Sequence, residues 1–559
     1  MKAPVYSTLP IVDVAGGEYL HLGVRHALVK CLSSTPASMH PVTPLEIDFS
    51  TDEASLDKVS KILMWPSQIR VANIPNSSPY IVGIFKGSTK PSSASLFFQP
   101  FKDEMQELLD NSLDFQNGNV FVRLRCFVAD APARSFSLGH RGHNSRAPCS
   151  RCWVRGEYIR AGVMVYKGTT HRLRTEDEYS SMVDTDHHNC IECPLASLGF
   201  NVVSSTVFDY MHLVCLGVME MGNIGIMGII DGRFVKSSKI SNKSHLQALN
   251  SRLELVKTYC PRDFARKPIL IEKHGKFKAT EQRQLLLNSG PIIFNGLVNS
   301  AVYNHFLLLH TAIRILVDPQ CTPQSIDFAE KCINLFNETA SDIYGVEFLS
   351  YNVHALLHLP DDVRSFGHLD TFSAFPYENN MTYCRKMCRK PSQHLQQIAN
   401  RNAENCHTQS KVPVDPSRLK YIGKHLKGPT PPIDDNNYCR YSRVLTGSLY
   451  LSILGQDSAV VLRNGCIATI KNIIQRDNSC YLVLNRFTKI DDLFNLPCRS
   501  SDIGVYICSA PSPKLMYVRL DQVAGKCFLM PYWSKEGTTK ECSSERFVVI
   551  KIISTKSVV

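Results

Sequence analysis

Several features that would place this chain in a special class of protein are missing. The sequence of 559 residues contains no run of about 18 apolar residues, so we expect no membrane-spanning helix. Its start, MKAPVYSTLP, has no basic segment followed by an apolar one, and we therefore expect no secretory signal peptide. Internal repeats and low-complexity tracts are absent, and GIFKGSTK lacks the spacing of a nucleotide-binding P-loop. With 44% hydrophobic and 20% charged residues the chain is not disordered throughout, and its length predicts about three or four domains.

The cysteine content and the net charge indicate further what kind of protein this is. The 20 cysteines do not indicate a disulfide scaffold, because a chain of this length without a signal peptide is expected to keep its thiols reduced, with a few on metal. Lysine and arginine number 62 against 50 aspartates and glutamates, a formal charge of +12. This excess favours a polyanionic partner such as nucleic acid.

An order of strands and helices typical of one α/β fold begins near residue 46. Residues 1–45 carry no clear element, and we interpret them as an N-terminal remnant. The next segments have the pattern of three strands, a helix and a strand: LEIDFST, QIRVANI, YIVGIFKG, SASLFFQPFKDEMQELLDN and NVFVRLRCFVAD. This is the opening order of a ribonuclease-H-like fold, so residues 46–140 are predicted to form the first part of such a core. In that fold one carboxylate lies on the first strand and another at or just beyond the fourth, which are the places of Asp52 and Asp130.

Two pairs of residues have the spacing of zinc ligands. CSRC supplies Cys149 and Cys152, the usual half-site for zinc. HALLH supplies His354 and His358, which at i and i+4 lie on one face of a helix. Together they predict a tetrahedral Cys2His2 site for Zn2+ that joins distant parts of the chain. The simpler alternative is that the cysteines pack in a core and the histidines lie on the surface.

Two other groups of histidines compete with this assignment. His305 and His310 are five positions apart, which turns about 140° around a helix, so we interpret them as core and capping residues. The motif HHNCIEC is a compact cluster with the residue types to bind zinc by itself. Its ligands would be His187, His188, Cys190 and Cys193.

Three carboxylates are candidates for a second metal centre. Asp52 and Asp130 end their predicted strands, and Glu378 lies 20 residues after His358, much as Asp130 lies 19 residues before Cys149. A zinc knuckle that ties these flanks together would bring the three acids near one another. Hard oxygen ligands select Mg2+ or Mn2+, and two such ions about 3.5–4 Å apart activate a water or a 3′-hydroxyl for attack on a phosphodiester. The alternative for each acid alone is a solvated surface charge.

The predicted fold class is therefore an α/β ribonuclease-H-like catalytic core, interrupted by a mostly helical insertion with a zinc knuckle and followed by a small all-β domain. Short alternating runs and hairpin signals such as RNG indicate that the last domain is barrel-like. After the first part of the core, the predicted parts are a zinc knuckle with the helical insertion (141–345), a helix completing the core and the zinc site (346–410), a linker (411–437) and the β-rich domain (438–559).

Five blocks of sequence, taken together with these residues, resemble CACTA (En/Spm)-type transposases and the transposon-derived "transposase domain-containing" proteins of invertebrates. The blocks lie between about residues 45 and 400 and read IPNSSPYIVGIFKGSTKPSSASLFFQPF, LRCFVADAPARSFSLGHRGHNSRAPCSRCWVRGEY, FDYMHLVCLGV, YNHFLLLHTAIRIL and FLSYNVHALLHLPDDVRSFGHLDTFSAFPYENNM. The resemblance implies a DDE-type transposase that cuts DNA and joins the freed 3′-hydroxyl to target DNA. It also implies that the protein acts on DNA in the nucleus.

The family's functional positions carry over residue by residue. Asp52, Asp130 and Glu378 match its catalytic, magnesium-binding acids, and Met211-His212 matches its Met/Leu-His signature within the insertion. The matching zinc positions are Cys149, Cys152, His354 and His358.

This sequence departs from the family in three places. Glu53 stands where the family usually has a glycine after the first acid, and Asp48 is a rival for the first acid itself. The chain also begins close to the predicted core, with little of the upstream segment that would bind DNA ends. These departures support an alternative, a catalytically inactive, domesticated nuclear protein that binds DNA or chromatin. A third interpretation, a purely structural zinc protein, leaves the acids unexplained.

Basic residues near the predicted centre are candidates for contact with the DNA backbone, and the alternative is a solvated face. Trp153, directly after Cys152, is expected to pack on the zinc knuckle. We expect no membrane partner, and the protein could assemble with copies of itself. The DNA-binding candidates are Arg134, Arg141, Arg146, Arg151, Arg155, Lys386 and Arg389.

Overall fold

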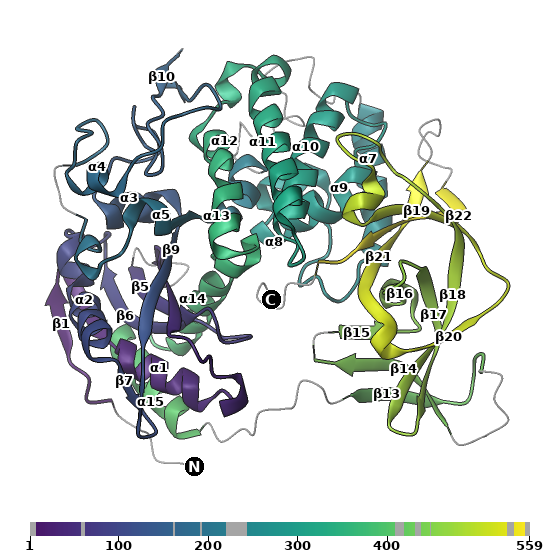
Figure 1. Cartoon of the computed structure of the whole chain (residues 1–559), viewed down its shortest axis with the longest axis horizontal. Helices are drawn as coiled ribbons and strands as arrows, with labels where there is room; N and C mark the ends of the chain where they lie inside the picture. Colours follow the sequence, from purple (N-terminus) through teal and green to yellow (C-terminus); the bar gives the residue numbers. More distant parts are fainter. Residues whose placement is uncertain are drawn as a thin grey trace. The chain divides into compact units, whose positions relative to one another are not determined.

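The computed structural model resolves the chain into two compact units, each formed from separate stretches of sequence (Figure 1). The first unit lies within Met1–Leu213 and Leu349–Pro413, and the second lies within Val214–Phe348 and Val414–Ser554. The structure describes residues 7–56, 62–159, 162–189, 193–219, 243–408, 419–430, 438–447, 449–533 and 542–553.

The first unit is built on a mixed eight-stranded sheet. Its strand order is β1-β2-β6-β5-β3-β9-β12, with β4 paired to β5. β3, β9 and β12 are parallel to one another, whereas β3, β5, β6, β2 and β1 pair in antiparallel fashion. The strands are β1 (Ile11–Val14), β2 (Gly17–His21), β3 (Leu45–Thr51), β4 (Ala54–Ser55), β5 (Leu63–Val71), β6 (Tyr80–Gly87), β9 (Val122–Ala129) and β12 (Thr206–Phe208).

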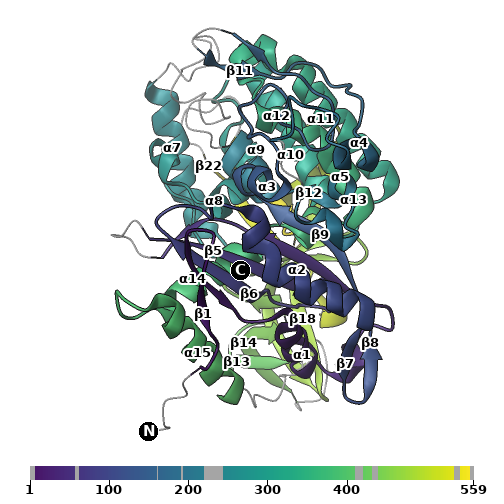
Figure 2. The same ribbon diagram turned by 90° about the vertical axis from the view of Figure 1, so that its left-hand side faces the viewer.

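Alternation along β3 separates a core face of this sheet from a polar one. Ile47 and Phe49 pack in the main apolar core, while Asp48 and Ser50, which alternate with them, point to the other face. Helices α1 and α2 cover the core face (Figure 2). The helices and small hairpins of this unit are α1 (Val24–Ser33), α2 (Ala94–Asn111), α3 (Ala131–Leu138), α4 (Glu176–Ser180), α5 (Val202–Ser205), α12 (Tyr351–Ala355), α13 (Leu359–Phe366), α14 (Phe375–Met387), α15 (His394–Thr408), β7–β8 (Leu113–Phe115 with Gly118–Val120) and β10–β11 (Glu157–Tyr158 with Met164–Val165).

The prediction that residues 1–45 contain no clear secondary-structure element was wrong. β1 and β2 form a hairpin whose second strand pairs with β6, in the register Glu18 to Lys86, and α1 packs on the sheet. The turn between the strands has positive φ at both Ala15 (52°) and Gly16 (86°). That conformation is typical of the tight hairpin turns usually signalled by Asn-Gly, and an alanine in the first position hides the signal.

The second unit combines a helical part with a β-rich part. Strand pairing follows the order β17-β16-β21-β22-β19-β18, and an additional pairing of β18 with β17 closes the ring into an antiparallel barrel. Its elements are α7 (Lys243–Tyr259), α8 (Ala279–Gln284), α9 (Gly290–Ile293), α10 (Ser300–Leu316), α11 (Pro323–Tyr344), β13 (Lys420–His425), β14 (Cys439–Thr446), β15 (Leu449–Ser452), β16 (Ala459–Leu462), β17 (Ile467–Arg476), β18 (Ser479–Asp491), β19 (Val505–Pro511), β20 (Met516–Arg519), β21 (Val523–Trp533) and β22 (Cys542–Lys551).

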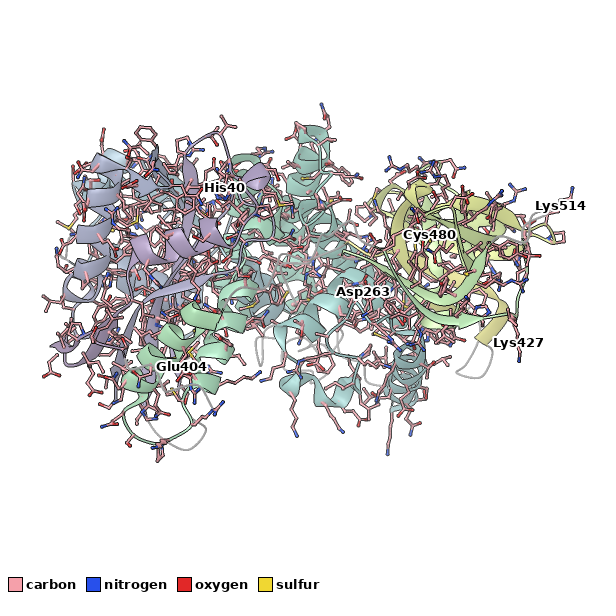
Figure 3. All side chains as sticks on the ribbon, turned by 90° about the horizontal axis from the view of Figure 1, so that it is seen from below. His40, Asp263, Glu404, Lys427, Cys480 and Lys514 are labelled. Atoms are coloured by element: carbon pink, nitrogen blue, oxygen red, sulfur yellow. The ribbon has the colours of Figure 1, made fainter. Side chains whose placement is uncertain are left out.

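Buried charges join the helical part to the barrel, which corrects the predicted domain boundaries. Arg314 of α10 donates from Nε to the carbonyl of Ile503 and from Nη2 to that of Lys551, each at 2.6 Å. Lys526 of β21 is paired with Asp263, labelled on the helical part in Figure 3, and its Nζ lies 2.8 Å from Asp457. The helical insertion therefore packs with the β-rich part, and the unit boundaries fall after residues 213 and 348.

The predicted linker is also shorter than 411–437, because β13 lies inside that range and pairs with β14. Within the described part of the chain, no helix is both long and apolar enough to cross a membrane.

Candidate metal centres

Two cysteines and two histidines from distant parts of the first unit converge in a buried cluster. Cys149 and Cys152 lie in the segment between α3 and β10, His354 is in α12, and His358 ends a short 3-10 turn, Leu356–His358, that continues α12. The Sγ of Cys149 is 3.4 Å from Nε2 of His358, and the Sγ of Cys152 is 3.3 Å from Nε2 of His354. All four donor atoms lie within 4.8 Å of one another.

These separations suit a tetrahedral zinc ion. Bonds of about 2.3 Å to sulfur and about 2.0–2.1 Å to nitrogen, at the tetrahedral angle, place the two donor atoms about 3.5 Å apart. Burial alone would raise the pKa of the Cys149 thiol, but the neighbouring Cys152 and His358 hold it well below its ordinary value. The hydrogen bond to Cys149 and burial raise the pKa of Cys152. The cluster thus already favours one thiolate, the form in which cysteine binds metal.

Arginine side chains hold the segment that carries Cys149 and Cys152 in place. Arg174 donates from Nε to the carbonyls of Cys149 (2.9 Å) and Cys152 (3.2 Å), and from Nη2 to Asp184 (2.7 Å). Trp153 packs among guanidinium groups, with those of Arg172 and Arg174 at 4.5 and 4.7 Å from its ring centre. Trp153 thus contributes to the knuckle through cation–π contacts.

Three of the predicted DNA-binding arginines are part of this interior rather than of a solvated face. Arg134 and Arg151 are buried, and Arg151 donates to Asp362 at 2.7 Å. Arg155 is half-buried and makes two hydrogen bonds to Asp184, at 2.9 and 3.0 Å. Arg151 and Arg155 pair with the buried carboxylates of Asp362 and Asp184. They are therefore not part of a continuous exposed basic surface. The exposed candidates are Arg141, Arg146, Lys386 and Arg389.

A second, oxygen-rich centre forms where three parallel strands end. Asp52 follows β3, Asp130 follows β9, and Asp209 follows β12, and because these strands are parallel neighbours their carboxyl ends meet at one edge of the sheet. Glu378, in the first turn of α14, reaches the same place. Nε2 of His212 lies 3.7 Å from Asp52 and 3.8 Å from Glu378.

Asp52, Glu378 and His212 form a cluster whose ligand atoms all lie within 4.8 Å of one another. Asp130 is not in that group. Its carboxylate caps α3 by accepting from the amide of Ala133 at 2.7 Å. Burial and the charge of Asp130 raise the pKa of Asp52 well above its ordinary value, so Asp130 lies near enough to act on it electrostatically. A divalent cation would relieve this repulsion, and carboxylate oxygens are ligands that suit Mg2+ or Mn2+.

His212 is held in place by Asp209, a residue that the sequence analysis did not consider. Nδ1 of His212 lies 2.8 Å from Oδ2 of Asp209, which also accepts from the His212 amide at 3.0 Å. Burial would lower the pKa of His212, but hydrogen bonds to Asp209 and Glu378 raise it well above its ordinary value. His212 was matched only to a family signature. The sequence signal that could have predicted the position of His212 in this centre is the spacing Asp209-x-x-His212 directly after a strand.

The rival first acid, Asp48, has a different partner set. It is fully buried and accepts from Arg125 Nε at 2.6 Å, from Arg70 Nη2 at 3.0 Å and from the thiol of Cys126 at 3.1 Å. Two arginines therefore balance its charge within the sheet's polar face. Asp48 is not part of the oxygen-rich cluster.

Glu53 does not distort the backbone next to Asp52. Its side chain is exposed, its φ is not in the left-handed region, and its amide donates to Oδ1 of Asp52 at 2.7 Å. A glycine is therefore not required at this position for the bond that orients Asp52.

The competing histidines have other roles. His305 is buried, with Nε2 2.8 Å from the carbonyl of Phe336, and Nδ1 of buried His310 is 2.7 Å from that of Leu286, as expected for core residues. His187 bonds the carbonyl of Ala147. Cys190 lies outside the described residues, and among those that are described His187, His188 and Cys193 do not form a metal-ligand group.

A family model described as a domain of unknown function (DUF8592) matches residues 424–552, the stretch that contains most of β13–β22. No curated protein matches the chain.

Proposed function

We propose that the chain is a transposon-derived, DDE-type transposase-like protein that carries out metal-dependent cleavage and transfer of DNA strands. The observation that carries this proposal is the convergence of Asp52, Glu378 and His212, which lie far apart in sequence, within 4.8 Å at the edge where Asp130 also ends its strand. Burial and the charges of Asp130 and Glu378 raise the pKa of Asp52, and acids gathered in this way are stabilised where a cation binds.

The order of elements supports a ribonuclease-H-like core. β3, β5 and β6 are followed by α2 and then β9, and the two acids come directly after β3 and β9. This is the opening order expected for that fold, with the acids at the expected places. The hairpin β7–β8 and the short β4 are additions that do not interrupt the pairing of β3 with β9.

Each residue of the oxygen-rich centre would have its own role in the reaction. Asp52, Asp130 and Glu378 would hold divalent cations, which when bound lower the pKa of a water or a 3′-hydroxyl and stabilise the leaving oxygen. Asp209 fixes the His212 ring through Nδ1, so that Nε2 faces Asp52 and Glu378. Burial and Asp130 raise the pKa of Asp52, whereas the positive charge on His212 acts in the opposite direction and would also attract the phosphodiester.

The cysteine–histidine cluster would be a structural zinc site. Cys149 and Cys152 come soon after α3, which Asp130 caps, and His358 precedes α13 and α14, which bring in Glu378. An ion bound by all four ligands would tie together the two flanks that carry acids. Structural zinc sites of this kind contribute directly to folding.

DNA is the proposed partner and the nucleus the proposed location. The formal charge of +12 favours a polyanion. Exposed basic residues include Arg141 and Arg146, which precede the cysteine pair in the chain, and Lys386 and Arg389, in the last turn of α14 and just beyond it. Assembly with further copies of the chain is part of the same proposal.

The test is nicking of supercoiled DNA by the purified chain in Mg2+ or Mn2+. We expect nicking that Asp130→Asn and Glu378→Gln abolish while the variants stay folded. Glu53→Gln is the matched control, since its exposed side chain leaves the amide bond to Asp52 in place. Unchanged nicking in Asp130→Asn would remove Asp130 from the centre, and no nicking by the parent chain would reject the proposal.

One observation favours the alternative of an inactive, domesticated DNA- or chromatin-binding protein. A charged His212 lies within 3.8 Å of both Asp52 and Glu378, so it can balance these acids without a metal. Binding of Mn2+, followed by its electron paramagnetic resonance signal, separates the two. The enzyme requires Mn2+ binding that Glu378→Gln weakens, and the alternative requires DNA binding with no Mn2+ site.

A further inference from the structure

Arg134 is a buried cation that has no hydrogen-bonding or ionic partner among the residues that the structure describes. It lies in α3, one helical turn after Asp130, and only 3% of its surface is exposed. Its Nε and Nη1 atoms are enclosed and have no hydrogen-bond partner, and it has no ion pair with any residue that the structure describes. The group it contacts is the ring of Phe208, whose centre is 4.2 Å from the guanidinium carbon.

Other buried arginines of this protein do have partners. Arg151 donates to Asp362, Arg174 to Asp184, and Arg252 and Arg314 donate to backbone carbonyls. A contact with an aromatic face offsets only part of the cost of removing a charge from water. The described residues around Arg134 therefore supply no anion to balance its charge.

The position of Arg134 indicates where that anion would come from. Phe208 is the last residue of β12 and pairs in register with Ala129, the last residue of β9, so Arg134 lies at the carboxyl ends of these strands. That edge also carries Asp130 and Asp209. The charges of Asp130 and Arg134 act on the same half-buried imidazole, that of His143, which Asp130 favours in its charged form and Arg134 disfavours.

We infer that Arg134 binds a phosphate group of the nucleic acid on which the oxygen-rich centre acts. This rests on the proposed function, because it assigns the anion to that centre's substrate. Nη2 is the guanidinium nitrogen that is not among the enclosed, unpartnered atoms, and it gives the group access to the surface. A phosphate at Nη2 would supply a charge-assisted hydrogen bond to the guanidinium group. It would also hold a negatively charged strand beside carboxylates that otherwise repel it.

The experiment compares the full chain with Arg134→Met, Arg134→Lys and the control Arg141→Met, which removes an exposed charge from the same segment. The probes are inorganic phosphate, followed by thermal unfolding, and a short DNA duplex, followed by fluorescence anisotropy at several salt concentrations. We expect Arg134→Met to fold at least as stably as the parent chain, because it removes an unpaired buried charge. It should lose the stabilisation by phosphate, bind DNA about ten-fold more weakly and reduce the salt dependence by about one phosphate contact.

Arg134→Lys should recover only part of the affinity, because lysine keeps the charge but does not place a planar N–H donor where Nη2 lies. Arg141→Met should keep the response to phosphate. If Arg134→Met is less stable than the parent chain yet keeps its DNA affinity and its phosphate response, Arg134 is a structural cation and the inference is wrong. If binding depends on Arg134 but no DNA is nicked in Mg2+, the inference stands and the proposed function fails.

Discussion

The carboxylate of Asp48 lies 2.6 Å from Nε of Arg125, inside the polar face of the sheet, whereas Asp52, one residue past the end of the same strand, faces His212. Two acids four residues apart on one chain segment therefore have opposite electrostatic surroundings. Asp48 is neutralised by two arginines, and Asp52 is placed among other acids.

Exchange of each acid for its amide should separate the two roles. Asp48→Asn leaves Arg70 and Arg125 without their carboxylate, so we expect the free energy of unfolding to fall by about 3 kcal/mol or more. Asp52→Asn removes a carboxylate that burial and Asp130 disfavour, so without metal its free energy of unfolding should be equal to or higher than that of the parent chain. Urea unfolding of both variants measures this, and a larger loss in Asp52→Asn than in Asp48→Asn would contradict the assignment.

Loss of one cysteine should remove the zinc ion. We expect the purified chain to contain about one zinc per molecule and Cys149→Ser to contain none, with a lower unfolding temperature, since metal binding and folding are coupled. Cys321→Ser, at a half-buried cysteine outside the cluster, is the control and should keep the metal. Mass spectrometry of the metal content gives the answer, and equal zinc in both variants would show that the cluster does not bind it.

Asp184 should contribute strongly to the stability of the cysteine segment. It accepts from Arg174, which is buried and also holds the carbonyls of Cys149 and Cys152, and from Arg155. Asp184→Asn leaves a buried guanidinium unpaired, so we expect a loss of about 3–5 kcal/mol. Glu157→Gln, in an exposed pair with Lys167, should change the stability little. Similar unfolding midpoints for the two variants would contradict the role given to Asp184.

Mild acid should destabilise the helical part of the second unit through its buried histidines. Burial lowers the pKa of His305 to about 4, from an ordinary value of 6.5. The folded state holds this ring neutral, so its contribution is complete above pH 6.5 and is lost as the pH falls from there toward 4. The loss attributable to His305 should be about 3 kcal/mol over that range.

His305→Gln should therefore show a shallower decline in unfolding free energy between pH 7 and pH 4 than the parent chain. The matched control is His245→Gln, at a half-buried histidine that also bonds a backbone carbonyl. A decline of equal slope in His305→Gln and the parent chain would show that His305 is protonated in the folded state at these pH values.

The local sequence pattern was sufficient to predict those strands and ligand pairs that depend only on residues close together in the chain. Alternation located β3 and β9, and the acids that follow them, because a half-buried strand shows its period in the sequence. The ligand-type pairs Cys149–Cys152 and His354–His358 were visible from their spacing, and the structure brings them together. The hairpin of β1 and β2 was missed, because its Ala-Gly turn and short strands carry a weak signal.

The sequence by itself determined which residue types were available to the two centres and the order in which the chain supplies them. Only the tertiary structure decided that Asp52 rather than Asp48 faces the oxygen-rich centre, that His212 completes it, and that Arg134 and Arg151 are interior. Those outcomes depend on the register of strands and on ion pairs between positions up to hundreds of residues apart. A buried charge takes its role from the partner that folding places beside it, and no local pattern contains that partner.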